Sequence, residues 1–142
     1  MGKKRRIRPI AVCVFRHRDR ILVYEGVDPT TGLRFCRPLG GGIELGEHSR
    51  EAVAREIQEE LGAGVTHLEL LGIVESIFVY RGEQHHEIVF AYDGRFVDET
   101  LYDRESLTAL EGEDAFEARW RSLAELRDGP IQLVPSELWD LL

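Results

Sequence analysis

Hydrophobic and polar residues alternate along several stretches of this chain, which is the pattern of half-buried β-strands. The alternation predicts strands over residues 7–17, 20–27, 66–80, 85–96 and 116–122. Tight turns are expected between the first two strands and, at Gly82, between the strands at 66–80 and 85–96. The hydrophobic positions between residues 49 and 62 follow a helical period instead.

Four apolar residues recur at helical spacing in that segment: Val53, Ala54, Ile57 and Leu61. They fall within one sector of a helix, so they are expected to anchor it to the core, and Gly62 is expected to end it.

Two further helices are predicted near the C-terminus. Ser122 and Glu125 form a capping box for a short helix over residues 122–129. Residues 135–142 predict a terminal helix that packs Leu138, Trp139 and Leu142 onto the domain. With no internal repeat or linker, residues 1–142 are expected to form a single domain.

The first of these helices also carries an acidic face. Because an α-helix advances about 100° per residue, Glu56, Glu59 and Glu60 project into one sector of its surface. Like charges at this spacing repel one another, and a bound divalent metal would relieve the repulsion. Oxygen ligands select hard cations such as Mg2+ or Mn2+ over zinc. The segment therefore predicts a metal site for phosphate chemistry.

A glycine-rich turn at residues 38–42 precedes the acidic helix. Glycine lets the backbone approach a ligand closely. A glycine turn that leads into a helix bearing carboxylates is a plausible way to hold a metal against a diphosphate.

The spacing of these residues resembles the Nudix box, G-x5-E-x7-R-E-U-x-E-E-x-G-U, in which U is aliphatic. Its positions are filled by Gly41, Glu47, Arg55, Glu56, Ile57, Glu59, Glu60 and Gly62. Only the last position departs, where Ala63 replaces a larger aliphatic residue. The resemblance implies an α/β/α sandwich with a mixed β-sheet. It also implies metal-dependent hydrolysis of a diphosphate bond in a nucleoside diphosphate linked to another group.

The resemblance also implies roles for the box residues. Glu56, Glu59 and Glu60 would be metal ligands, with the Gly41 carbonyl as a further one. Glu56 would help to deprotonate the attacking water. Arg55 and Glu47 would orient the helix and its carboxylates.

Many members of this family take a further acid from a loop outside the box. The candidates in this chain are Glu111, Glu113, Asp114 and Glu117, with Glu113 and Asp114 preferred because they precede a predicted strand. Glu87 is a separate candidate. The adjacent His85 and His86 do not predict a zinc site, because neighbouring strand residues point to opposite faces.

The substrate is the least determined feature of the sequence. Arg37 is the preferred phosphate contact because a guanidinium can grip two oxygens. Phe35 and Tyr80 are candidates for stacking on a base, and Tyr80 lies roughly where dinucleoside polyphosphate hydrolases of the family carry a tyrosine. ADP-ribose, nucleotide sugars, dinucleoside polyphosphates and nucleotides all remain open.

Composition limits the partners. A net charge of −8 argues against a nucleic-acid partner. The basic run at residues 3–6 is expected to be a solubilising tip, and no apolar stretch predicts a membrane span or signal peptide. Two cysteines are too few for a disulfide framework, which favours a reducing cytoplasm. A homodimer stays open because dimers are common in the family.

Two alternative functions also stay open. Isopentenyl diphosphate isomerases share the resemblance and use a cysteine and a glutamate for proton transfer, and Cys36 lies near the glycine turn. Those enzymes, however, carry a degraded box. A sensing module without turnover would typically have lost a box glutamate, and this chain retains all of them.

Overall fold

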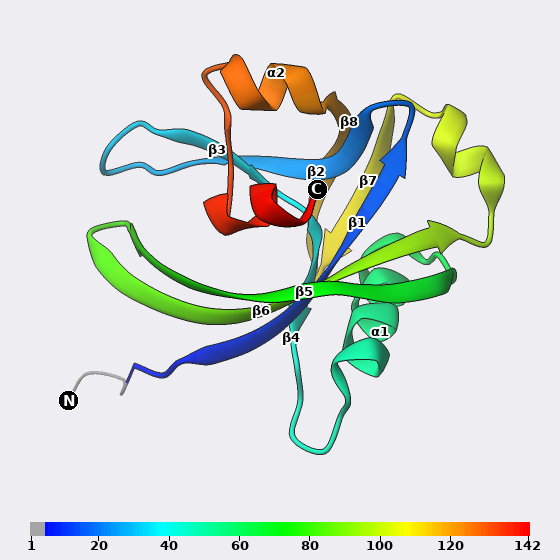
Figure 1. The fold of residues 1–142 in the computed structure, drawn as a ribbon, viewed down its shortest axis with the longest axis horizontal. Helices are drawn as coiled ribbons and strands as arrows, with labels where there is room; N and C mark the ends of the chain where they lie inside the picture. Colours follow the sequence, from blue (N-terminus) through cyan, green and yellow to red (C-terminus); the bar gives the residue numbers. More distant parts are fainter. Residues whose placement is uncertain (1–4) are drawn as a thin grey trace.

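Nine strands, two α-helices and two 3-10 segments lie within residues 5–142, the range that the computed structural model describes (Figure 1). Their order is β1 (Arg8–His17), β2 (Arg20–Val27), β3 (Arg34–Arg37), β4 (Leu39–Gly42), α1 (Ser49–Leu61), β5 (Val65–Tyr80), β6 (Glu83–Phe96), η1 (Glu99–Asp103), β7 (Ser106–Glu111), β8 (Asp114–Ser122), α2 (Leu123–Asp128), β9 (Gln132–Leu133) and η2 (Ser136–Leu141). Lys3 and Lys4 of the basic run lie outside the described residues.

The strands form a branched, mixed sheet with two arms. One arm has the order β5-β6-β1-β4, and the other has the order β7-β8-β2-β3-β9. β1 and β2 join the arms, yet they pair only at Arg16↔Ile21 and His17↔Arg20. β1 with β6 and β3 with β9 are parallel pairs, and the other pairs are antiparallel. Beyond the short β1–β2 hairpin the arms separate, so side chains of β3 can face those of β5 and β6.

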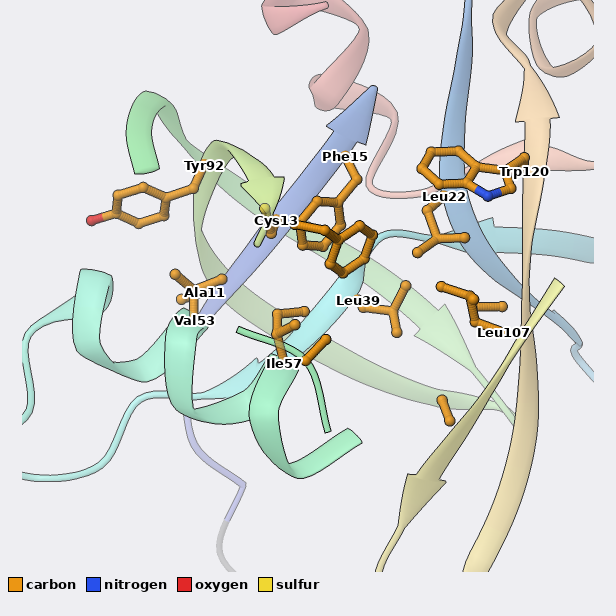
Figure 2. Close-up of a cluster of buried hydrophobic side chains, with 14 of the residues drawn as sticks. Ala11, Cys13, Phe15, Leu22, Leu39, Val53, Ile57, Tyr92, Leu107 and Trp120 are labelled. Atoms are coloured by element: carbon orange, nitrogen blue, oxygen red, sulfur yellow. The ribbon is translucent and has the colours of Figure 1, made fainter. Parts of the chain in front are cut away.

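Two apolar clusters hold the helices against opposite faces of this sheet. On one face Val53 and Ile57 of α1 pack with Ala11 of β1 and Leu39 of β4 (Figure 2). On the other face Leu126 of α2 and Leu138 of η2 pack with Val12, Val23 and other strand residues. The layers are therefore helix, sheet and helix, which confirms the predicted α/β/α sandwich with a mixed sheet. Its burial of apolar area is the main source of stability.

Most predicted elements are present. The strand predicted at 66–80 is β5, although its pairing with β6 shifts register at two points, between Thr66 and Glu69 and between Leu70 and Gly72. Ser122 Oγ accepts a hydrogen bond from the Glu125 N–H at 3.2 Å, as the capping box predicts for α2. The terminal helix is a 3-10 segment, η2, rather than a longer α-helix.

Four strands were not predicted: β3, β4, β7 and β9. The β4 residues Leu39–Gly42 were expected to form a glycine turn but pair with β1. Residues 106–111 form β7, in which buried Leu107 and Ala109 alternate with more exposed neighbours. β7 pairs with β8 through Glu111↔Asp114. The acidic segment therefore forms the tight turn of a hairpin, instead of a loop that precedes a single strand.

Within residues 5–142 no helix combines the length and the apolar character that crossing a membrane requires.

Candidate active site

Helix α1 is fixed at both ends. Near its start Ser49 Oγ and Tyr92 Oη share a hydrogen bond of 2.6 Å, and Glu51 Oε1 accepts from the His48 N–H at 3.2 Å. At its end Gly62 adopts a left-handed backbone conformation (φ 64°), and its N–H donates to the Gln58 carbonyl at 2.9 Å. Glycine tolerates this conformation without strain. With its apolar face buried, α1 presents its acidic edge toward β4.

Glu56 lies directly against the backbone of β4. A methyl group built on Gly41 would stand 2.6 Å from each carboxylate oxygen of Glu56, closer than real carbon atoms approach. Only glycine therefore leaves room for this carboxylate at position 41. Gly42 is different, since a methyl group there would meet nothing nearer than Arg8 Nη2 at 3.7 Å.

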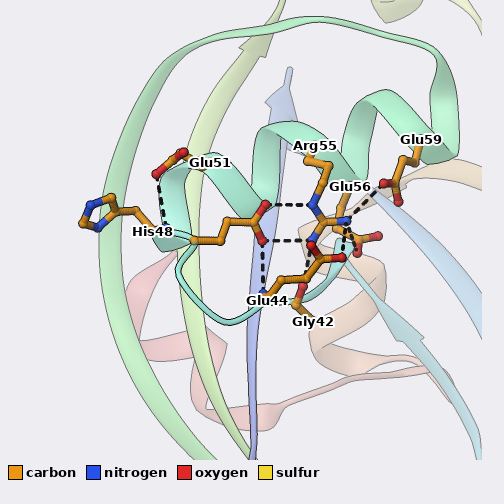
Figure 3. Close-up of polar contacts among 8 residues, drawn as sticks. Gly42, Glu44, His48, Glu51, Arg55, Glu56 and Glu59 are labelled. Carbon is orange, nitrogen blue, oxygen red and sulfur yellow. Dashed lines mark hydrogen bonds and ion pairs between the residues drawn. The ribbon is translucent and has the colours of Figure 1, made fainter.

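Arg55 ties Gly42 of β4 to the acidic face of α1 (Figure 3). Its Nε and Nη2 donate to the two carboxylate oxygens of Glu47 at 2.8 and 3.0 Å, and Nη2 also donates to the Gly42 carbonyl at 3.0 Å. Nη1 donates to Glu56 at 3.0 Å and to Glu59 at 3.2 Å. The guanidinium lowers the pKa of Glu47 below its usual range. One planar cation thus sets the position of three carboxylates.

Glu60 is the buried member of the acidic group. The residue is 8% exposed, and its Oε1 has no hydrogen-bond partner. Burial, followed by the negative charges of Glu56 and Glu111, raises the pKa of Glu60 to about 8. Burial is also the main reason that the pKa of Glu56 is raised. A buried carboxylate oxygen without a partner is costly, and a cation would satisfy it.

A cavity of about 370 Å³ brings the box residues together. We call it the acidic cavity; its polar walls include Gly41, Glu56, Glu59 and Glu60. Among residues 5–142 no three His, Cys, Asp or Glu side chains form a ready-made ligand group, and Glu59 accepts a hydrogen bond from Arg55. The donor set is nevertheless made only of oxygens and contains the unpartnered Glu60 Oε1. These residues fit a hard divalent cation.

The acids considered outside the box lie in different places. Glu111 lines the acidic cavity, whereas the preferred Glu113 and Asp114 are exposed in the β7–β8 turn and do not line it. Glu87 is 5% exposed and accepts a hydrogen bond from Arg37 Nη2 at 2.8 Å. Its second oxygen lies 4.0 Å from Arg8 Nη1. Glu87 is thus occupied by two arginines.

The three predicted substrate residues share a second, larger pocket of about 560 Å³. Phe35 and Arg37 come from β3 and Tyr80 from β5. The rings of Phe35 and Tyr80 meet edge to face, with centroids 5.8 Å apart. The separation of the two sheet arms explains the contact between these rings, since β3 in one arm and β5 in the other border the gap between the arms. We call this the aromatic pocket.

Sequence reasoning missed several residues of the acidic cavity: Arg8, Tyr24, Leu110 and Phe116. They come from β1, β2, β7 and β8, and no local motif marks them.

The family model for the NUDIX domain matches residues 5–140. The chain belongs to this family. No curated protein matches the chain significantly.

Solved structures with a similar fold include other members of the family. One is a MutT NUDIX hydrolase from Burkholderia pseudomallei, at 24% identity and a TM-score of 0.61, covering 96% of each chain. Another is a MutT protein from Methanosarcina mazei Go1, at 19% identity and a TM-score of 0.61, covering 99% of this chain and 93% of the other. A UDP-X diphosphatase has 16% identity and a TM-score of 0.61, covering 99% of this chain and 63% of its own. At these identities the likeness establishes the fold.

Proposed function

We propose that this chain is a metal-dependent diphosphohydrolase that cleaves a diphosphate bond in a nucleoside diphosphate linked to another group. Family membership supports hydrolysis of a diphosphate in general. The observation that carries the proposal is the acidic cavity, where Glu56 lies against Gly41 and buried Glu60 has an unpartnered oxygen. That arrangement leaves negative charge unsatisfied beside a backbone that a ligand can approach closely.

Glu56, Glu59 and Glu60 would hold Mg2+ or Mn2+, together with the Gly41 carbonyl. Bound divalent cations supply charge neutralisation of phosphate oxygens and a water of lowered pKa. Arg55 and Glu47 act by orientation, because their paired hydrogen bonds fix the glutamates relative to β4. Such residues are positioning residues, whose loss costs about 10–100-fold in metal affinity or activity.

We propose Glu56 as the base that accepts the proton of the attacking water, because its carboxylate lies against Gly41 in the acidic cavity. It is half-buried, and burial raises its pKa. A carboxylate with a raised pKa is a stronger base than an exposed one. Glu111 lines the same cavity and is our preferred acid outside the box, ahead of Glu113 and Asp114.

The isomerase alternative depends on Cys36, and its surroundings are unfavourable. Cys36 is fully buried in the apolar cluster on the η2 side of the sheet. Burial raises the pKa of its thiol to about 12, so it is poorly suited to proton transfer with a substrate. The sensing alternative gains no support either, because every box glutamate is present.

A substrate panel tests the proposal. Purified protein is incubated with Mg2+ or Mn2+ and ADP-ribose, nucleotide sugars, dinucleoside polyphosphates, oxidised nucleotides or coenzyme A. We expect hydrolysis of at least one of them, abolished by a chelator and restored by added metal. Absence of phosphate-containing products from the whole panel would contradict the proposal.

A further inference from the structure

The wall of the aromatic pocket opposite Phe35 and Tyr80 comes from the C-terminal part of the chain. Trp139 of η2 and Arg127 of α2 line it. In Figure 1, η2 lies between the β2–β3 and β5–β6 hairpins, and it packs against β5 and β9. None of the residues at this wall belongs to the box or to the substrate residues predicted from the sequence.

Trp139 is held as a preorganised ring at this wall. The Arg127 guanidinium lies over the indole, 4.3 Å from its ring centroid. A cation over an aromatic face is an attractive contact, so it favours one orientation of the ring. Trp139 is half-buried, and Leu138 beside it is fully buried and anchors η2. The pocket is therefore lined by rings from β3, β5 and η2 before any ligand enters.

The aromatic pocket and the acidic cavity are connected by a chain of close contacts. Arg37 lines the aromatic pocket and donates to Glu87 at 2.8 Å. Glu87 faces Arg8 at 4.0 Å, and Arg8 lines the acidic cavity beside Gly42. Two arginines share one carboxylate, so a net positive charge lies between the two sites. That charge suits a phosphate placed between a metal site and an organic group.

We propose that the aromatic pocket binds the base of the nucleotide substrate, and that Trp139 of η2 is a specificity-determining residue that contacts this base. The pocket of about 560 Å³ lies within the usual range for small-ligand sites and is lined mainly by apolar groups. Planar bases stack on aromatic side chains. The inference rests on the proposed diphosphatase function, because it assumes that the substrate carries a base.

The fluorescence of Trp139 tests this contact directly. The chain has two tryptophans, and Trp120 lies buried in the cluster on the α1 side. In a Trp120→Phe variant Trp139 is the sole indole. We expect AMP, GMP, CMP or UMP to quench its emission saturably without added metal. Ribose 5-phosphate, which lacks a base, should leave the emission unchanged.

Substitution of the wall then separates binding from chemistry. We expect Trp139→Leu to weaken binding of the quenching nucleotide by about 5- to 100-fold, measured by calorimetry. The KM of the cleaved substrate should rise while kcat stays within about two-fold. Trp139→Phe should recover most of the affinity. Arg127→Met keeps the indole and should therefore give a smaller loss of nucleotide affinity. Thermal melts of each variant reveal any folding defect.

The outcomes distinguish this inference from the function on which it rests. The protein could hydrolyse a diphosphate while nucleotides leave Trp139 emission unchanged, or while Trp139→Leu keeps its nucleotide affinity. Either result would overturn the inference and leave the proposed diphosphatase function standing. Equal quenching by ribose 5-phosphate would also overturn it. Saturable base-dependent quenching in a protein that hydrolyses no diphosphate would support the pocket and overturn the proposed activity instead.

Discussion

The acidic cavity and the aromatic pocket differ in the state of their charged groups. In the acidic cavity Glu60 keeps an oxygen without a partner, and Glu56 lies against a glycine. In the aromatic pocket the cation Arg37 already has its partner, Glu87, and the walls are mostly rings and aliphatic groups. Unpartnered carboxylate oxygens suit metal cations, whereas apolar area suits an organic group. Under the proposed function, we therefore expect chemistry and substrate selection in separate parts of the molecule.

The largest expected effect is the loss of Glu59. Glu59→Gln should lower kcat by about 100-fold or more, beyond the 10–100-fold range of residues that only orient ligands. The amide keeps the shape of the side chain and removes its charge, so the fold should persist. Steady-state kinetics at saturating Mg2+ and a thermal melt measure both.

Glu69→Gln is the matched control for that charge change. Glu69 is exposed on β5 and does not line the acidic cavity. Its substitution should leave kcat within about two-fold, because exposed charges away from a site contribute little. Equal losses in the two variants would remove the distinction between the acidic cavity and the rest of the acidic surface.

Arg55→Lys should lower activity by about 10–100-fold. Lysine keeps the charge but cannot reproduce the two parallel bonds to Glu47 or the bond to the Gly42 carbonyl. The expected signature is a raised requirement for Mg2+, seen as a shifted activation curve. A variant with an unchanged metal requirement would show that the guanidinium geometry is dispensable.

Gly41→Ala and Gly42→Ala form a matched pair in β4. The new methyl at position 41 would collide with the Glu56 carboxylate, whereas the one at 42 meets only Arg8 Nη2 at an ordinary 3.7 Å. The Glu56 carboxylate is the end of a flexible side chain, so its displacement should change stability little but cost about tenfold or more in kcat at position 41 alone. Denaturant melts and kinetics on both variants check this; identical behaviour would refute the close approach.

Phe35→Leu examines the other region. Loss of one ring from the aromatic pocket should raise KM by about 3- to 10-fold with little change in kcat, since a single stacking contact is modest. The measurement is a full kinetic profile on the best substrate of the panel. A fall in kcat with unchanged KM would mean that the aromatic pocket contributes to the chemical step and not to substrate binding.

The smallest expected effect is a change in the free energy of unfolding in the Glu60→Gln variant. In metal-free buffer at a pH above the raised Glu60 pKa of about 8, the amide removes a buried charge whose Oε1 has no partner, so the variant should be about 1–3 kcal/mol more stable than the parent. Added Mn2+ should raise the melting temperature of the parent and leave that of the variant nearly unchanged. A variant that is less stable without metal would contradict the unpartnered state of Glu60.

The two regions were also unequally predictable. The box is contiguous, so its helix and its stop at Gly62 follow from local spacing alone, whereas the predicted glycine turn is the strand β4, whose pairing with β1 is not local. Phe35 and Trp139 are far apart in the sequence and line one pocket only because the two sheet arms diverge from the β1–β2 hairpin. β7 escaped prediction because it is short and ends in the acidic turn, and that error drew attention to Glu113 and Asp114 instead of Glu111.

Binding of Mn2+ to the acidic cavity is the most direct test of the central claim. Free Mn2+ is followed by electron paramagnetic resonance as protein is titrated in, with methylene diphosphonate present as a diphosphate that cannot be cleaved. Saturable loss of the free-ion signal by the parent, and its retention in the Glu56→Gln/Glu60→Gln double variant, is the predicted result. Equal uptake by both proteins, or none by either, would contradict the account.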